Sequence, residues 1–370
     1  MNVPFVDLKQ QYQSIKEEVL KEINEVLDNT AYICGKKAKQ LEQDFAKIQD
    51  SKYAVALSSG TAALHVALWA LGIKQGDEVI VPVNTFIATS EGVTLCGASP
   101  VFIDNDERTY NIDVNKIEAA ITHKTKAILP VHLYGQPAEM DTILEIAKKH
   151  KLFVVEDSSQ AHLATYKDRK VGSIGDIGTF SFYPGKNLGA YGESGAVTTS
   201  NEVLYNKMIR FRQHGSVEKY VHEFEGHNYR IEEIQAGVLN VKLKYIEKWT
   251  NDRKRAADLY TKTFNSMGLQ QIVLPYHPDY VNPVYHLYII RVQDREKLMK
   301  FLDSNGVQTG LHYPYPLHET KAYESMGYVP EDFPVASKYA KEILSIPMFP
   351  EITDEMILYV CEKIKEYYTK

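Results

Sequence analysis

Cysteine is scarce in this chain. The 370 residues include only three cysteines, Cys34, Cys96 and Cys361, which lie far apart and form no CxxC pair. Their spacing matches neither a metal site nor a disulfide framework. The scarcity indicates a reducing compartment, and we expect no structural metal.

The chain also lacks long apolar runs and an excess of positive charge. No apolar run reaches the length of roughly 20 residues that crosses a membrane. Residues 1–9 have neither the basic start nor the apolar centre of a signal peptide. The formal net charge of -6 offers no basic field to nucleic acid or to an anionic membrane. We therefore expect a cytoplasmic protein without a nucleic-acid or membrane partner.

Short apolar runs alternate with helical patterns through the first half of the chain. This alternation is typical of an α/β fold with a parallel sheet covered on both faces. Two amphipathic helices, at 10–28 and 38–48, precede it. We predict strands at 53–57, 78–82, 100–103, 126–131 and 152–156, separated by helices at 61–72, 85–96, 113–121 and 138–150.

The pattern changes in the second half. Strands at 178–183 and 196–199 have no helix between them, so we expect some antiparallel pairing. A long helical stretch at 230–266 leads to a strand at 285–292, helices at 295–304, 334–344 and 353–368, and a Pro-rich loop at 313–316. Hydrophobic residues make up 44% of the chain, enough for two cores. We predict a large domain over 1–250 and a smaller α+β domain over 251–370.

Lys186 follows an apolar run and a Pro-Gly break, and glycines recur after it up to Gly195. A strand that ends in such a loop presents its last side chains to a cleft. A desolvated lysine loses its proton there and attacks a carbonyl carbon, which is the chemistry of a Schiff base with a sugar, a keto acid or pyridoxal phosphate (PLP). Taken alone, the alternative of an exposed loop lysine is the commoner case.

Two further stretches suit a ligand that carries both a negatively charged and a positively charged group. Residues 58–61, Ser-Ser-Gly-Thr, lie between a strand and a helix, where free N–H groups attract an oxyanion; an ordinary Ser or Thr helix cap is the alternative. Neither GxGxxG nor GxxxxGK[ST] occurs there, so a dinucleotide fold and a P-loop are not supported. Glu156 and Asp157 end another strand, where a desolvated carboxylate needs a cation such as a protonated pyridine nitrogen. The spacing in the sequence does not show which of the two carboxylates would pair with the cation.

Several motifs then follow one another in a characteristic order. They resemble those of the DegT-type nucleotide-sugar aminotransferases from about residue 4 to the C-terminal helix. The motifs are Gly35 with 41–46, 59–64, 76–82 with Thr85 and Phe86, 131–135, 156–157 with 160–162, 181–182 with Lys186, and 228–230. The resemblance implies a fold-type I PLP transferase, with a mostly parallel seven-stranded sheet in the large domain.

The resemblance also implies roles at the matched positions. Lys186 would bind PLP covalently and act as general base and acid, and Asp157 would pair with the pyridine nitrogen. Asn228 would reach the cofactor of the neighbouring subunit, which implies a homodimer with shared active sites. The other implied PLP-binding residues are Gly60, Thr61 and Ser181 at the phosphate, Phe86 on the ring and Gln160 at the ring hydroxyl.

Substrate-binding candidates have less specific patterns. Tyr183 lies three residues before Lys186, and it faces the sugar or packs under the loop. His214 and Lys219 belong to a stretch that resembles the family's mobile segment near the substrate; a solvated lysine is the alternative for Lys219. Tyr313 and His318 lie in the Pro-rich loop, which borders the cleft or acts as a rigid connector.

The implied reaction moves an amino group from glutamate to a nucleotide-linked keto-deoxysugar. Relatives that act as sugar dehydratases carry histidine at the position of Lys186, so that reaction is disfavoured. Many relatives that aminate sugar C-3 carry glutamine at the position of Gln160, which favours a dTDP-linked 3-keto-6-deoxyhexose. A C-4 ketosugar aminotransferase, another PLP-dependent reaction and a regulatory protein remain as alternatives.

Overall fold

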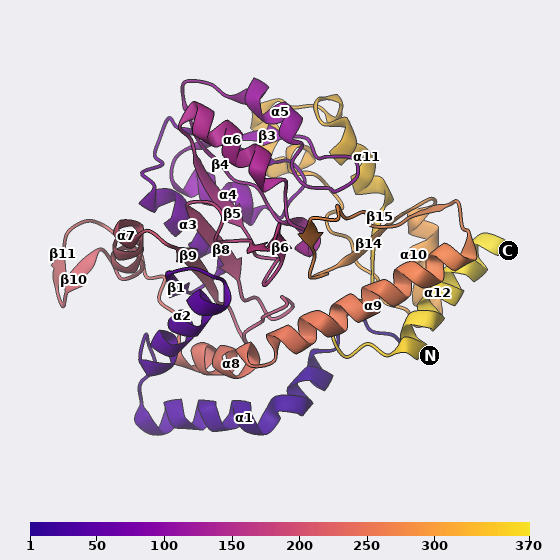
Figure 1. Cartoon of the computed structure of the whole chain (residues 1–370), viewed down its shortest axis with the longest axis horizontal. Coiled ribbons are helices and arrows are strands. Elements are labelled where there is room, and N and C mark those ends of the chain that lie inside the picture. The colour runs from indigo at the N-terminus through magenta and orange to yellow at the C-terminus, as the bar shows by residue number, and fades with distance from the viewer.

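A seven-stranded sheet forms the centre of the larger part of the molecule (Figure 1). The computed structural model describes all 370 residues. Neighbouring strands pair in parallel except at β9, which runs against both β1 and β8. The predicted mostly parallel sheet and the antiparallel pairing at its end are confirmed. Across the sheet the order is β1 (Tyr53–Leu57), β9 (Gly195–Thr199), β8 (Ile177–Ser181), β5 (Phe153–Asp157), β4 (Thr125–Ile128), β2 (Glu78–Pro82) and β3 (Ser99–Ile103).

Successive residues of the sheet strands face two different cores, as the period of two requires. In β2, Val79 and Val81 lie in the core that contains α3 (Gly60–Ala70) and α7 (Glu202–Arg212). Ile80 lies in the core on the other face, with α2 (Lys36–Ile48) and α6 (Met140–His150). Nearly every residue of α3 is buried, and it packs closely on α4 (Ala88–Leu95). A helix that is apolar on all sides belongs inside the core.

A smaller unit surrounds a three-stranded antiparallel sheet, at the right of Figure 1. Its strands are β12 (Ile272–Val273), β14 (Tyr288–Val292) and β15 (Ile343–Ile346), with β14 in the middle. Helices α9 (Ile246–Met267), α10 (Arg295–Ser304) and α12 (Asp354–Thr369) enclose its core. The chain start joins this unit, because Val3 is fully buried there and pairs with Val307.

Several elements have other bounds than predicted. The helical stretch expected at 230–266 is two helices, α8 (Glu233–Leu243) and α9, separated at Lys244–Tyr245. The break allows α8 to pack on α1 (Leu8–Asn29) and α2 while α9 continues to α12. The helix expected at 334–344 ends as α11 (Pro334–Glu342), because the next residues pair with β14 as strand β15.

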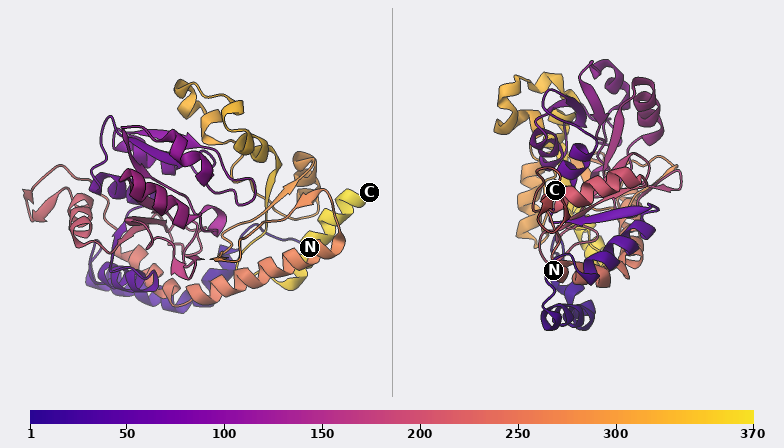
Figure 2. Two further views of the ribbon diagram at one scale, coloured as in Figure 1. Left: turned by 45° about the horizontal axis from the view of Figure 1, so that its top comes forward. Right: turned by 90° about the vertical axis from the view of Figure 1, so that its left-hand side faces the viewer.

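The boundary predicted near residue 250 falls inside α9, so one continuous helix connects the two units. A short hairpin, β10 (Ser216–Glu218) and β11 (Val221–His222), extends from α7 away from the central sheet (Figures 1 and 2). We call residues 213–228 the arm. No helix of the structure is long and apolar enough to cross a membrane.

Candidate active site

The loop after β8 holds Lys186 in a fixed turn. The Lys186 N–H donates to the Tyr183 carbonyl at 2.8 Å. The Asn187 side chain donates to the Val284 carbonyl at 3.1 Å and lies 3.2 Å from the His286 ring, which ties the loop to the segment that precedes β14. At Gly189 an added Cβ would lie 2.3 Å from the Pro184 carbonyl oxygen, so only glycine permits this close turn.

The surroundings of Lys186 lower the pKa of its amine. Burial lowers its pKa to about 8, although the nearby Asp157 carboxylate opposes the shift. Three histidines face the same space, and burial together with the Lys186 charge lowers the pKa of His162 to about 3 and that of His312 to about 4. The pKa of His286 falls well below its ordinary value for the same reasons. The amine therefore lies among neutral rings near pH 7.

Asp157 and Glu156 end the same strand but point to opposite faces of the sheet. Glu156 is fully buried, and its oxygens accept from the amides of Gly172, Ile174 and Gly175 at 2.7–2.8 Å and contact His132 at 3.0 Å. Those bonds fix a loop beneath the sheet. Only Asp157 faces Lys186, so the structure distinguishes two carboxylates that spacing alone left equivalent.

The Asp157 carboxylate has two hydrogen-bond donors. Thr89 of α4 donates to Oδ2 at 2.8 Å, and the Ser159 amide donates to Oδ1 at 3.1 Å. The carboxylate is 4% exposed. The two donors set the orientation of the carboxylate.

The Gln160 amide has a fixed orientation. Its Oε1 accepts from the Tyr134 amide at 2.6 Å, and its Nε2 donates to the Tyr313 hydroxyl at 3.0 Å. One Nε2 hydrogen remains for a ligand oxygen. The Tyr313 ring lies 5.8 Å from the ring of Phe86, which is 54% exposed and therefore free to stack on a flat ligand.

The first turn of α3 meets the end of β8. A Cβ at Gly60 would lie 2.7 Å from Ser181 Cβ and 3.1 Å from Ser181 Oγ, so the missing side chain lets the two segments approach. The Ser59 hydroxyl oxygen accepts from the Ala62 amide at 3.0 Å. This bond is the ordinary helix cap that the sequence allowed as an alternative. The N–H groups of Gly60 and Thr61 and the Thr61 and Ser181 hydroxyls remain available to an oxyanion.

These residues fit PLP. A helix N-terminus with free N–H groups, a buried carboxylate, an amine with a lowered pKa and an exposed aromatic side chain each suit a different part of that cofactor. The structure thus brings together Gly60, Thr61, Phe86, Asp157, Gln160, Ser181, Lys186 and Tyr313, with the exposed Tyr183 at the edge.

The other candidates lie elsewhere in the chain. His214, Lys219 and Asn228 are exposed residues of the arm, and Asn228 accepts from the Arg230 side chain at 3.0 Å. His318 does not join the group around Lys186. Its buried ring lies 4.7 Å from that of Phe333 and 3.3 Å from the Ser337 hydroxyl, because the chain turns under α11 after the Pro-rich loop.

Sequence reasoning missed several residues of the site. Tyr134 donates its hydroxyl to the His312 carbonyl at 2.5 Å, and Thr89 bonds Asp157. The sequence analysis assigned no role to His162 or His286. A signal for Tyr134 existed in the motif at 131–135, whereas nothing local distinguishes Thr89 from other helix threonines.

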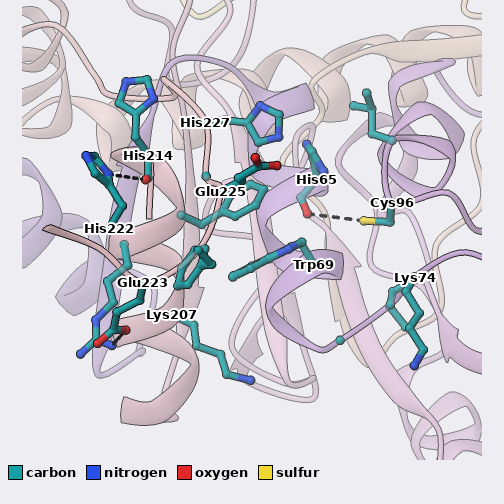
Figure 3. Close-up of a pocket in the computed structure, with 17 residues that line it drawn as sticks. His65, Trp69, Lys74, Cys96, Lys207, His214, His222, Glu223, Glu225 and His227 are labelled. Carbon is teal, nitrogen blue, oxygen red and sulfur yellow. Dashed lines mark hydrogen bonds and ion pairs between the residues drawn. The ribbon is translucent and has the colours of Figure 1, made fainter. Parts of the chain in front are cut away.

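A cavity of about 1040 Å³ lies between α3, α7 and the arm (Figure 3). Trp69 stacks on Phe211 with ring centroids 4.1 Å apart. His65 lies 3.1 Å from the Tyr229 hydroxyl, and burial lowers its pKa to about 4. His214 lines this cavity, which contains none of the residues around Lys186.

Comparison with known proteins agrees with this geometry. The DegT/DnrJ/EryC1/StrS aminotransferase family model matches residues 13–365. A "Pleiotropic regulatory protein" of Geobacillus stearothermophilus is 44% identical over 368 residues, covering 100% of this chain and 99% of the relative. The dTDP-3-amino-3,4,6-trideoxy-alpha-D-glucose transaminase of Streptomyces venezuelae is 40% identical over 365 residues, covering 99% and 96%.

The fold comparison is equally extensive. The crystal structure of S. venezuelae DesV in complex with a ketimine intermediate matches with a TM-score of 0.98 and 39% identity, covering 100% of this chain and 99% of that one. The match includes both units of the molecule, and the sequence-based expectation of the family, the fold type and the cofactor is confirmed. The chain belongs to the DegT/DnrJ/EryC1/StrS aminotransferase family and is a fold-type I aminotransferase that uses PLP.

Proposed function

We propose that this enzyme transfers the amino group of glutamate to a nucleotide-linked keto-deoxysugar, with a dTDP-linked 3-keto-6-deoxyhexose as the acceptor. The observation that carries the proposal is the half-buried Lys186, whose amine has its pKa lowered to about 8 and lies near the Asp157 carboxylate. The choice of sugar rests on Gln160 and on the resemblance described above.

PLP supplies a reactive carbonyl carbon and a ring that takes up electrons. The protein contributes a proton carrier: Lys186 Nζ, when free and neutral, takes the proton from the α-carbon of the amino donor and returns it. The Thr89 and Ser159 donors orient the Asp157 carboxylate, which would pair with the ring nitrogen of the cofactor. The neutral histidines around Lys186 add no competing positive charge.

Residues at the edge of the cofactor ring and over its face would bind the cofactor. The α3 N-terminus with Gly60 and Ser181 would hold the phosphate, and the free hydrogen of Gln160 would reach the ring hydroxyl. Phe86 would cover the ring. Tyr183 and Tyr313, at the open edge, are proposed to contact the sugar.

The proposed dimer has shared active sites, with Asn228 acting in the partner's site. Asn228 is an exposed residue at the base of the arm, where it bridges to Gln213, and its exposure supports a contact with a partner subunit. His214 and Lys219 of the same arm are proposed to meet the substrate of the partner.

An absorbance experiment tests the first half of the reaction. The PLP-loaded protein is measured before and after glutamate, next to Lys186→Ala and the control Lys248→Ala, an exposed lysine of α9 that is 72% exposed. We expect glutamate to move the visible band to shorter wavelength in the wild type and the control, and Lys186→Ala to lack that band. A band that ignores glutamate would favour another PLP-dependent reaction or a regulatory role.

The acceptor is then tested directly. Protein converted by glutamate is offered 3-keto and 4-keto 6-deoxyhexoses, each linked to dTDP or UDP, and the recovery of the visible band is followed. We expect recovery with the dTDP-linked 3-keto sugar, and NMR of the product should place nitrogen on C-3. Recovery with 4-keto sugars alone would refute the C-3 assignment and leave the aminotransferase intact.

Subunit mixing tests the shared site. Lys186→Ala and Asn228→Ala proteins are each inactive or impaired alone, but a mixed dimer contains one site with both Lys186 and Asn228. Random reassortment of equal amounts should restore wild-type behaviour at about a quarter of the sites. No recovery after complete subunit exchange would show that Asn228 acts within its own subunit.

A further inference from the structure

One hydroxyl of α4 contacts the carboxylate on which PLP chemistry depends. Thr89 Oγ1 lies 2.8 Å from Asp157 Oδ2, and Thr85 Oγ1 lies 2.9 Å from Thr89 Oγ1. The three residues are 1–4% exposed. No water therefore competes for these bonds, and the geometry of the group is set by the protein alone.

The direction of the bonds follows from charge. An ionised carboxylate only accepts, so Thr89 donates its single hydroxyl hydrogen to Asp157. The oxygen of Thr89 must then accept from Thr85, which makes a chain of two hydroxyls that both point their hydrogens toward Asp157. A hydroxyl that receives one hydrogen bond becomes a better donor for the next.

A purely structural role would place the Thr89 hydroxyl differently. Threonine inside a helix commonly bonds a carbonyl one turn earlier, and its branched side chain holds few rotamers. Thr89 instead directs its hydroxyl across to β5. Phe86, the residue proposed to cover the ring, lies two residues before α4, so one short segment carries both Phe86 and the hydroxyl that contacts Asp157.

We propose that Thr89 is a positioning residue that holds the Asp157 carboxylate in the orientation that meets the ring nitrogen of PLP, with Thr85 as the supporting donor. The inference rests on the proposed role of Asp157. It adds a residue that touches neither the reacting atoms nor the cofactor, and that acts only through Asp157.

The test compares four variants. Thr89→Val removes the hydroxyl and keeps the shape, Thr89→Ser keeps the hydroxyl, and Thr85→Val removes the supporting donor. Thr94→Val is the matched control, because Thr94 is an exposed residue of α4 whose hydroxyl bonds only the Glu91 carbonyl. Each protein is measured for its PLP dissociation constant, its unfolding midpoint and the ¹⁵N resonance of the ring nitrogen in ¹⁵N-labelled PLP.

We expect Thr89→Val to weaken PLP binding about tenfold, the usual effect of losing a hydrogen bond to a buried charge. Its ¹⁵N resonance should move toward that of the unprotonated ring. Thr89→Ser should stay within about twofold of the wild type, Thr85→Val should lie between the two, and Thr94→Val should match the wild type.

Two results would overturn the inference. In the first, Thr89→Val retains wild-type affinity and an unchanged ¹⁵N resonance. In the second, Thr89→Ser loses as much as Thr89→Val, which would assign the effect to the methyl group and its packing. Neither readout needs an amino donor or a sugar, so failure of this inference is distinguishable from failure of the proposed transamination.

Discussion

The lowered pKa of Lys186 gives a pH dependence that differs sharply from that of an ordinary lysine. With a pKa of about 8 in place of 10.5, the amine is neutral in about one molecule in ten at pH 7, against about one in 3,000 for an unperturbed lysine. Only the neutral amine attacks PLP. The rate of PLP capture by the apoprotein should therefore rise about tenfold between pH 7 and pH 9 and then level off, whereas an exposed lysine would gain about a hundredfold over the same range.

The sign of the Asp157 effect provides a second check. Burial lowers the pKa of Lys186, and the negative charge of Asp157 opposes that shift. Asp157→Asn removes the opposing charge, so the pKa of Lys186 should fall further and the midpoint of PLP capture should move below pH 8. The Thr94→Val protein should keep the wild-type midpoint.

Stopped-flow absorbance at the visible band of lysine-bound PLP measures the capture rate. PLP has ionisations of its own, so the same pH series is run with Nα-acetyllysine, and the ratio of the two rates reports the protein amine alone. A ratio that stays constant with pH would mean that Lys186 titrates like a solvated lysine. That result would refute the argument that burial prepares the amine.

Two further predictions follow from the same site. Gly60→Ala should raise the PLP dissociation constant at least tenfold in equilibrium dialysis, because its Cβ would lie 2.7 Å from Ser181 Cβ. Gly185→Ala is the control and should be tolerated, because its Cβ would meet nothing closer than 3.9 Å. Equal PLP affinities of the two variants would contradict this account of the phosphate site. Lys186→Met should stabilise the apoprotein by up to about 3 kcal/mol at pH 7, since folding lowers the lysine pKa from 10.5 to about 8. The gain is complete below pH 8 and shrinks toward pH 10.5, so urea unfolding at pH 7 and pH 9.5 should differ, and an equal gain at both would indicate packing instead.

The large sheet was predictable because its strands are short apolar runs that end at polar residues or breaks. The strands observed at Tyr53–Leu57 and Glu78–Pro82 have the predicted bounds. The choice between Glu156 and Asp157 was not predictable in the same way. Neighbouring residues of a strand face opposite sides, and which side carries the lysine depends on how β8 pairs with β5.

Strand β15 shows how tertiary pairing overrides a local pattern. Its residues, Ile343–Ile346, continue an amphipathic helical stretch, and all four are buried. Pairing with Tyr288–Val292 satisfies their backbone groups inside the smaller core, which no local propensity encodes. His318 illustrates the converse error: an aromatic, Pro-rich loop predicted a cleft residue, but the chain leaves the cleft at Pro316 and buries the ring.

The rigidity of the Lys186 loop depends on residues that are distant in sequence. On one side, Lys242 of α8 donates to the Gly189 carbonyl at 2.7 Å, and Gln235 of the same helix accepts from the Tyr191 amide at 2.9 Å. Burial lowers the pKa of Lys242 to about 8 as well, so the protein accepts a second desolvated amine to anchor the loop. On the other side, the Asn187 side chain donates to the Val284 carbonyl. A loop held by α8 and by the segment around Val284 presents the Lys186 amine in one place, and this is why a sequence motif identifies the lysine but only the fold explains its altered pKa.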